Sequence, residues 1–69
     1  MNTIILNGET RPVDYATTAT VAALLAGLGH QGKRVAVEKN GEIVPRSLHS
    51  TTPLADGDKI EIVVAVGGG

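Results

Sequence analysis

The sequence contains no cysteine, tryptophan or phenylalanine, and only one tyrosine. Because cysteine is absent, neither a disulfide nor a thiolate zinc site can stabilise the fold, and the packing of aliphatic side chains must do so alone. A chain of 69 residues forms one domain with a thin core, which leaves little volume for a buried active site.

Charge of one sign and long apolar runs are also missing. Six lysines and arginines face seven aspartates and glutamates, so neither a basic stripe nor an acidic block indicates nucleic acid or anionic lipid as a partner. No apolar run approaches the ~20 residues of a membrane helix, and the amino-terminal stretch MNTIILNGET lacks the features of a secretory signal. We therefore expect a cytoplasmic protein that binds neither nucleic acid nor membrane.

Groups arranged for catalysis are absent as well. His30 and His49 fall in expected connections without a partner motif, so we interpret both as surface histidines rather than catalytic or metal-binding ones. Asp56 and Asp58 flank Gly57 in a sequence typical of an acidic turn, and no glycine pattern of a phosphate-binding loop occurs. We expect no catalytic residue, no metal and no bound cofactor, and hence a protein that is not an enzyme.

The first expected element is a β-hairpin. Residues 3–6 and 10–15 flank Asn7 and Gly8, a pair that tolerates positive φ at both turn positions. Pro12 has no N–H to donate, which restricts the returning strand to a sheet edge or a bulge.

A second hairpin and a final strand are expected in the other half of the chain. The hairpin turns at Asn40 and Gly41, and Leu48 and Leu54 are expected to anchor the following connection onto the core. Residues 59–66, KIEIVVAV, form the most apolar strand, so we place it at the centre of the sheet.

One amphipathic helix of about ten residues is expected between the hairpins, capped by Thr18 or Thr20 and ended by Gly29 in a left-handed conformation. Its apolar face has helical spacing and consists of Val21, Leu24, Leu25 and Leu28. A single helix covers only one face of a sheet, so the other face meets solvent. We therefore expect an α+β fold in which a mixed sheet of about five strands packs on one helix over residues 1–66, with a flexible glycine tail at residues 67–69.

The open sheet face is expected to carry an apolar stripe. Alternation along the last strand places Val63 and Ala65 there, where Ile5 and Ala36 join them. Such a stripe is a candidate docking surface, although small exposed apolar residues are also ordinary on soluble proteins.

Three glycines follow this strand directly, without the serines of a usual flexible linker. The ordinary interpretation of terminal glycines is a frayed end. They reach about 10 Å at ~3.3 Å each, which suits insertion into the pocket of another protein. Without a Cβ, such a tail fits a narrow channel and leaves its last carbonyl carbon open to attack. An ionised carboxylate is a poor electrophile, so we expect activation by adenylyl transfer from ATP.

The segments NGEIVPR, LADGDKIEI and AVGGG, together with the element order, resemble the thiamine-biosynthesis sulfur carrier family (ThiS) over essentially the whole chain. The resemblance implies the ubiquitin-like β-grasp fold, in which the last strand lies parallel beside the first. It also implies that a ThiF-type adenylating enzyme activates the Gly69 carboxylate, that a cysteine desulfurase or another donor supplies sulfur for a thiocarboxylate, and that thiazole synthase receives this sulfur. Gly68 then completes the diglycine, and Gly67 extends the tail.

Alternatives to this interpretation stay open. Arg46 either docks an acidic patch of the activating enzyme or only caps a turn. Similar terminal chemistry occurs in the molybdopterin synthase small subunit, which delivers sulfur to a pterin precursor, and in protein modifiers that form isopeptide bonds. A ubiquitin-like interaction domain without terminal chemistry is the alternative from a different class.

Overall fold

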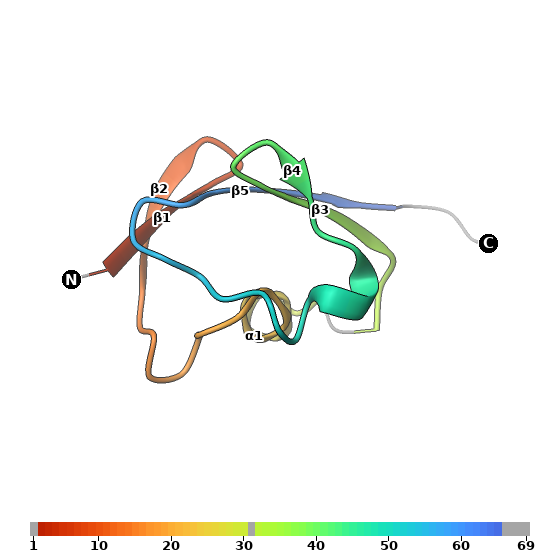
Figure 1. Ribbon diagram of the computed structural model, residues 1–69, viewed down its shortest axis with the longest axis horizontal. Coiled ribbons are helices and arrows are strands. Elements are labelled where there is room, and N and C mark those ends of the chain that lie inside the picture. Colours follow the sequence, from red (N-terminus) through yellow and green to blue (C-terminus); the bar gives the residue numbers. More distant parts are fainter. Residues whose placement is uncertain (1, 31, 66–69) are drawn as a thin grey trace.

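The computed structural model describes residues 2–30 and 32–65, which form one sheet with a helix beneath it (Figure 1). Its elements are β1 (Asn2–Leu6), β2 (Glu9–Val13), α1 (Val21–Gly27), β3 (Val35–Lys39), β4 (Glu42–Ile43), the 3-10 turn η1 (Arg46–Leu48) and β5 (Lys59–Val64). The sheet order is β2, β1, β5, β3, β4, and β5 is parallel to β1 and antiparallel to β3. The predicted mixed sheet with a central last strand is confirmed, whereas the expected boundary between residues 66 and 67 lies outside the described residues.

Both hairpin turns adopt the left-handed backbone conformation that their sequences predict. The four turn residues and their φ angles are Asn7 (+49°), Gly8 (+85°), Asn40 (+52°) and Gly41 (+86°). Each asparagine also binds β5, because Asn7 Oδ1 accepts the Ile62 N–H at 2.8 Å and Asn40 Oδ1 accepts the Lys59 N–H at 2.9 Å. The two turns therefore hold the central strand from both sides.

β2 lies at the edge of the sheet, as Pro12 predicts, and pairs only with β1 among the described strands. It ends at Val13 rather than at residue 15. The reason is a turn that begins at Asp14, whose carboxylate accepts the Ala16 N–H at 2.9 Å and whose carbonyl accepts the Thr18 N–H at 2.7 Å.

α1 begins and ends at the capping residues expected from the sequence. Thr20 is the N-cap, and its hydroxyl accepts the Ala23 N–H at 3.2 Å. Beyond the other end, Gly29 has a φ of +79° and the His30 N–H donates to the Leu25 carbonyl at 2.9 Å. This Schellman-type ending stops the helix after seven residues, which is shorter than predicted.

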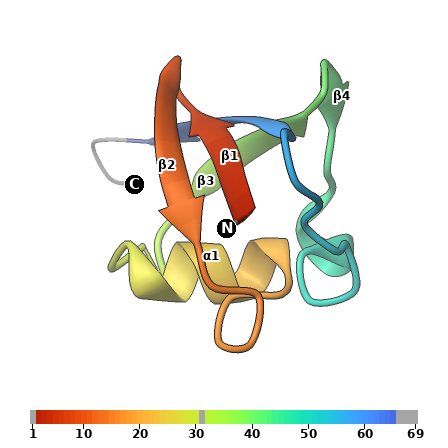
Figure 2. The same cartoon turned by 90° about the vertical axis from the view of Figure 1, so that its left-hand side faces the viewer.

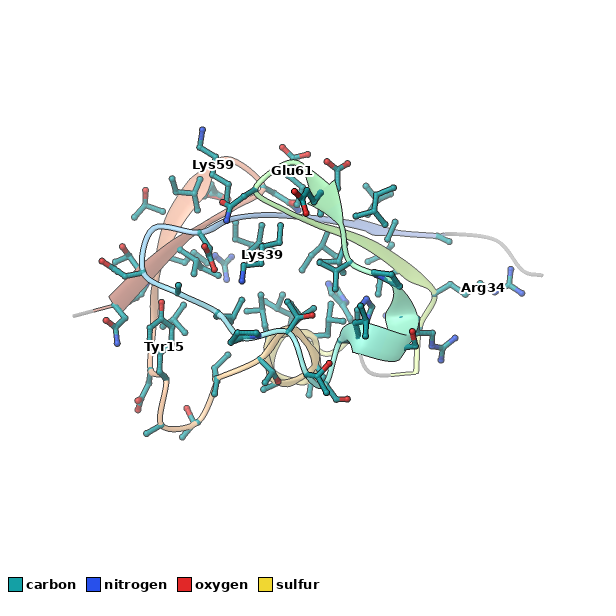
Figure 3. All side chains as sticks on the ribbon, in the orientation of Figure 1. Tyr15, Arg34, Lys39, Lys59 and Glu61 are labelled. Atoms are coloured by element: carbon teal, nitrogen blue, oxygen red, sulfur yellow. The ribbon has the colours of Figure 1, made fainter. Side chains whose placement is uncertain are left out.

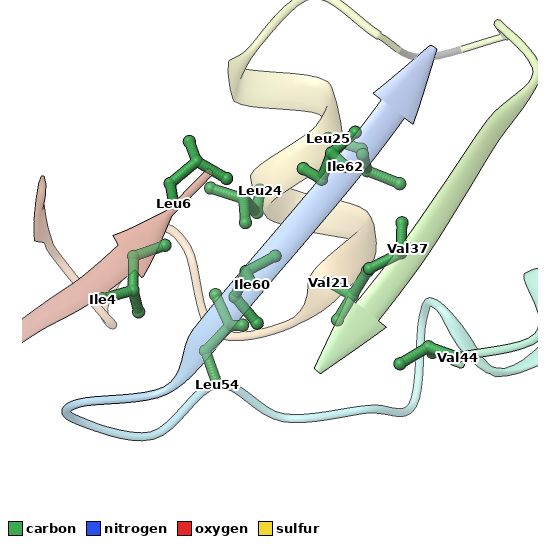
Figure 4. Packing of buried hydrophobic residues seen from close by; sticks show 10 residues of the cluster. All are labelled: Ile4, Leu6, Val21, Leu24, Leu25, Val37, Val44, Leu54, Ile60 and Ile62. Atoms are coloured by element: carbon green, nitrogen blue, oxygen red, sulfur yellow. The ribbon is translucent and has the colours of Figure 1, made fainter. Parts of the chain in front are cut away.

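The hydrophobic core lies between α1 and one face of the sheet (Figures 2 and 4). Its buried members are Ile4, Leu6, Val21, Leu24, Leu25, Val37, Val44, Leu54, Ile60 and Ile62. Leu54 anchors the connection before β5 as predicted, but the prediction for Leu48 is wrong, because the side chain in η1 is 48% exposed. Within residues 2–30 and 32–65, no helix is long and apolar enough to cross a membrane.

Candidate functional site

β5 carries the chain from the centre of the sheet to the end of the molecule where the described residues stop (Figure 1). The pairing with β3 continues one residue beyond β5, since the Ala65 N–H donates to the Arg34 carbonyl at 2.9 Å. The backbone is therefore held in the sheet up to Ala65. Gly67, Gly68 and Gly69 lie outside the described residues, so their role as the reactive tail stays a prediction.

The open sheet face carries the apolar residues that alternation predicts. Ala36 lies directly opposite Val63 in the β3–β5 register, and the Val63 side chain is 67% exposed. Ala65 is also exposed and follows on the same face toward the tail. Ile5 is half-buried and pairs with Lys59 rather than with Val63, so it lies further from the tail than the other three.

Ile43 belongs to the same face, a position that was not predicted for it. It lies opposite Glu38 in the β3–β4 register, and its side chain is 78% exposed. The signal was present in the sequence, because Ile43 and Val44 are adjacent and only one of them can face the core. Val44 takes the core position at 8% exposure.

Arg46 lies apart from this open face. It begins η1, and it lines a shallow pocket of about 260 Å³ together with Ala22 and Leu25 of α1. Lys33 and Arg34 contribute to the same pocket, which lies on the helix side of the sheet. The two regions considered for docking therefore occupy different sides of the molecule.

The surface assignment of the histidines is wrong for His49 and incomplete for His30. His49 is 8% exposed, and its Nε2 lies 3.1 Å from the Val44 carbonyl, which requires that this nitrogen carry the proton and donate. The His49 carbonyl accepts the Ala22 N–H at 2.8 Å, which ties the connection after β4 to the first turn of α1. His30 is half-buried, and its Nδ1 has no hydrogen-bond partner among the described residues.

The acidic turn before β5 is structural, as predicted. The Asp56 carboxylate accepts the Thr3 N–H at 2.7 Å, and Gly57 has a φ of +82°. Asp58 is 7% exposed and faces the Lys39 ammonium at 3.4 Å. Burial alone would raise the pKa of Asp58, but hydrogen bonds and the Lys39 charge outweigh it and leave that pKa below its ordinary value. Within the described part of the chain, no three histidine, aspartate or glutamate side chains gather to hold a metal ion.

Comparison with known proteins assigns the chain to a family, since the sequence model of the ThiS family matches residues 4–69. The chain belongs to the ThiS family. It is similar to the sulfur carrier protein ThiS of Bacillus subtilis, with 44% identity over 75% of this chain and 79% of that protein. The crystal structure of the thiamine biosynthesis protein ThiS from Geobacter metallireducens has a TM-score of 0.79 and 37% identity, and the match covers 97% of this chain and 99% of that one.

A larger protein contains a similar region. The thiazole synthase of Paramagnetospirillum magneticum is 47% identical over 96% of this chain, and the match covers 20% of that protein. The chain thus spans about a fifth of the length of the thiazole synthases it matches. The family match and the solved structure therefore agree on the ThiS family and on its ubiquitin-like β-grasp fold.

Proposed function

We propose that this chain carries the sulfur atom for thiazole formation as a thiocarboxylate on Gly69, and that it acts as a co-substrate rather than as a catalyst. The observation that carries the proposal is that the family match runs through residue 69 and therefore includes all three glycines. The scaffold supports it as well, because β5 is held on both sides and the sheet pairing continues to Ala65, the last described residue before the glycines.

The proposed chemistry begins with the carboxylate, which is a poor electrophile when ionised. In a ThiF-type adenylating enzyme, a Gly69 oxygen attacks the α-phosphorus of ATP, and pyrophosphate leaves. The terminal sulfur of a persulfide on a cysteine desulfurase or another donor then attacks the acyl carbon and AMP leaves, which gives an acyl disulfide. A thiol attacks the donor's sulfur in this intermediate, so that the S–S bond breaks, the thiocarboxylate leaves, and the donor and the thiol are joined in a disulfide. Glycine suits the attack by sulfur because no Cβ shields the acyl carbon. ATP is consumed by the activating enzyme and is not a resident cofactor of this chain.

Thiazole synthase is the proposed acceptor of the sulfur. The support is that a thiazole synthase of Paramagnetospirillum magneticum includes a region 47% identical to this chain. Joining a carrier to its acceptor in one polypeptide raises the effective concentration of one for the other, which benefits partners that meet in every cycle.

The open face is the proposed docking surface for the activating enzyme. Val63, Ala36 and Ala65 lie on it near the tail, and Ile5 extends it toward β1. Covering such exposed apolar side chains contributes roughly 25 cal/mol for each Å² removed from water. Arg46 on the helix side is proposed as a second, separate contact for an acidic group of a partner.

Intact-mass measurement tests the carrier function. The protein is incubated with ATP, the adenylating enzyme and a sulfur donor, and we expect a mass gain that corresponds to one oxygen replaced by sulfur, located at Gly69 by fragmentation. A sample without ATP and a variant lacking Gly68 and Gly69 should gain nothing. An unchanged parent mass, or an equal gain in the shortened variant, contradicts the proposal.

A second step separates thiazole formation from delivery to a pterin. The thiocarboxylated protein is mixed with thiazole synthase and its other substrates, and we expect the sulfur to leave the protein as thiazole forms. If the thiocarboxylate persists while that enzyme is competent with another sulfur source, the thiazole assignment is wrong and only the carrier chemistry stands.

A further inference from the structure

Two glutamates face each other across the middle of the open sheet face. Glu38 of β3 and Glu61 of β5 are directly opposite in the antiparallel register, and both are exposed. Side chains in such a pair point to the same side of the sheet with Cβ atoms about 4.5–5.5 Å apart, and like charges placed there destabilise the strand pair. The isolated domain therefore keeps an unfavourable pair where a neutral one would be more stable.

Within the described part of the chain, neither glutamate of this pair forms an ion pair. The ion pair found among the described residues joins Lys39 to Asp58, and Lys39 points toward the helix side of the sheet, away from the two glutamates (Figure 3). Lys59 shares the open face with Glu61 and borders the same hollow as both glutamates, but it forms no ion pair with either carboxylate. The pair thus presents two adjacent negative charges to whatever covers the face.

The residues around the glutamate pair are apolar and exposed. Ile43 lies on the far side of Glu38 in the β4 register, and Val63 with Ala36 forms the next cross-strand pair toward the tail. Ile43 and Val63 are 78% and 67% exposed, so the sheet presents two large aliphatic side chains beside two carboxylates. A small anion or a nucleic acid does not suit this combination, whereas a protein surface with an apolar patch and one cationic side chain does.

We propose that the activating enzyme docks on this face by placing one arginine or lysine between Glu38 and Glu61 while its apolar side chains cover Ile43 and Val63. Arginine suits the site better, since its planar fork donates to two carboxylates at once. The inference rests on the proposed function only for the identity of the partner. It adds that the partner must carry a positive charge and that Glu38 and Glu61 bind this charge.

The test is a double variant, Glu38→Gln with Glu61→Gln, which keeps shape and removes both charges. If the pair serves docking, stability and binding change in opposite directions. Relief of repulsion should raise Tm by about 1–5 °C, and loss of the partner's cation contact should raise the Kd for the activating enzyme about tenfold. Added salt should weaken binding of the parent more than that of the variant.

Glu42→Gln is the matched control. It removes one glutamate charge from the neighbouring β4, but Glu42 pairs with Lys39 and so faces away from the open side. We expect its Kd to stay within about twofold of the parent, since net charge alone has little effect on a short-range contact.

Each outcome decides one question. An unchanged Kd for the double variant, a change matched by Glu42→Gln, or a parent that does not bind the enzyme overturns the inference. If the parent binds in a glutamate-dependent way but never acquires sulfur, the docking inference stands and the carrier function fails. If the parent and the double variant acquire sulfur with the same KM, the carrier function stands and the docking inference fails.

Discussion

Asp58→Asn is the substitution that most directly tests how the fold holds β5 in place. The carboxylate is 7% exposed, accepts two hydrogen bonds and forms an ion pair with Lys39. Asn40 Nδ2 lies 3.0 Å from Oδ1, the Ala55 N–H lies 2.7 Å from Oδ2, and the Lys39 ammonium lies 3.4 Å from the same Oδ2. Asparagine keeps the shape but offers one acceptor oxygen and no charge, so at least one donor faces an amide N–H₂.

The expected cost follows from these contacts. A hydrogen bond to a charged group contributes about 1.5–3 kcal/mol, and breaking a buried ion pair by removing one partner costs about 3–5 kcal/mol. Because asparagine retains one acceptor and some water reaches the site, we expect a loss of about 2–3 kcal/mol. A domain of this length has a total stability of about 3–10 kcal/mol, so Tm should fall by about 10–20 °C.

The pH dependence of this effect has a definite sign. The pKa of Asp58 is lowered in the folded protein, so the folded state binds fewer protons than the unfolded state and the carboxylate stabilises the fold above the ordinary value of 3.8. That contribution is lost as pH falls through the folded-state pKa. The gap in Tm between parent and variant should therefore be widest at neutral pH and narrow in acid.

Thermal unfolding followed by circular dichroism at several pH values measures this gap. Asp14→Asn is the control, because Asp14 is exposed and its turn tolerates asparagine equally well. If Asp58→Asn unfolds within a degree or two of the parent at neutral pH, or if the gap widens in acid, the reasoning about this carboxylate is refuted.

Two further predictions concern Tyr15 and Val63. The Tyr15 hydroxyl is buried and has no hydrogen-bond partner in residues 2–30 and 32–65. Desolvation, followed by the charges of Asp56 and Asp58, raises the pKa of this group above its ordinary 10.0. Tyr15 is the only tyrosine, so the tyrosinate absorbance should titrate with a midpoint above 10.0. The stabilisation that the protonated hydroxyl contributes should be lost as pH rises through the folded-state pKa. A titration midpoint at or below 10.0 contradicts this prediction. Val63→Lys should raise the KM for adenylation about tenfold while Tm stays within about 2 °C, since the side chain is 67% exposed. Unchanged adenylation kinetics would mean that the docking face is misplaced.

The strands were predictable from the sequence because local chemistry determines them. The Asn-Gly pairs supply positive φ at both turns, and period-two alternation divides β5 into a core side with Ile60 and Ile62 and an open side with Val63. Pro12 excluded β2 from the centre of the sheet, which left an inner position for the last strand. The apolar part of the candidate docking face followed from the same alternation.

The segment between β4 and β5 was predicted poorly because its burial depends on distant contacts. His49 is buried through its bond to Val44 and through the Ala22 N–H, while the Val21 N–H donates to the Thr52 carbonyl at 3.0 Å. These bonds satisfy N–H groups that the first turn of a helix leaves unpaired, so the connection folds against α1. No periodic pattern in the segment indicates which of its side chains pack against α1. Leu48 was therefore predicted to face the core, although its side chain is exposed to solvent.

β5 carries both the proposed docking residues and the approach to the proposed reactive tail, so both depend on the register of this strand. A slip of one residue along β5 would bury Val63, expose Ile62 and shift the tail by about 3.3 Å. The side chain of Asn7 prevents this from the β1 side by binding both the N–H and the carbonyl of Ile62, at 2.8 and 3.2 Å. Asn40 does the same from the β3 side through the Lys59 N–H. A partner that binds the open face therefore meets a β5 strand whose register is fixed by two asparagine side chains, up to the point where the proposed reactive tail begins.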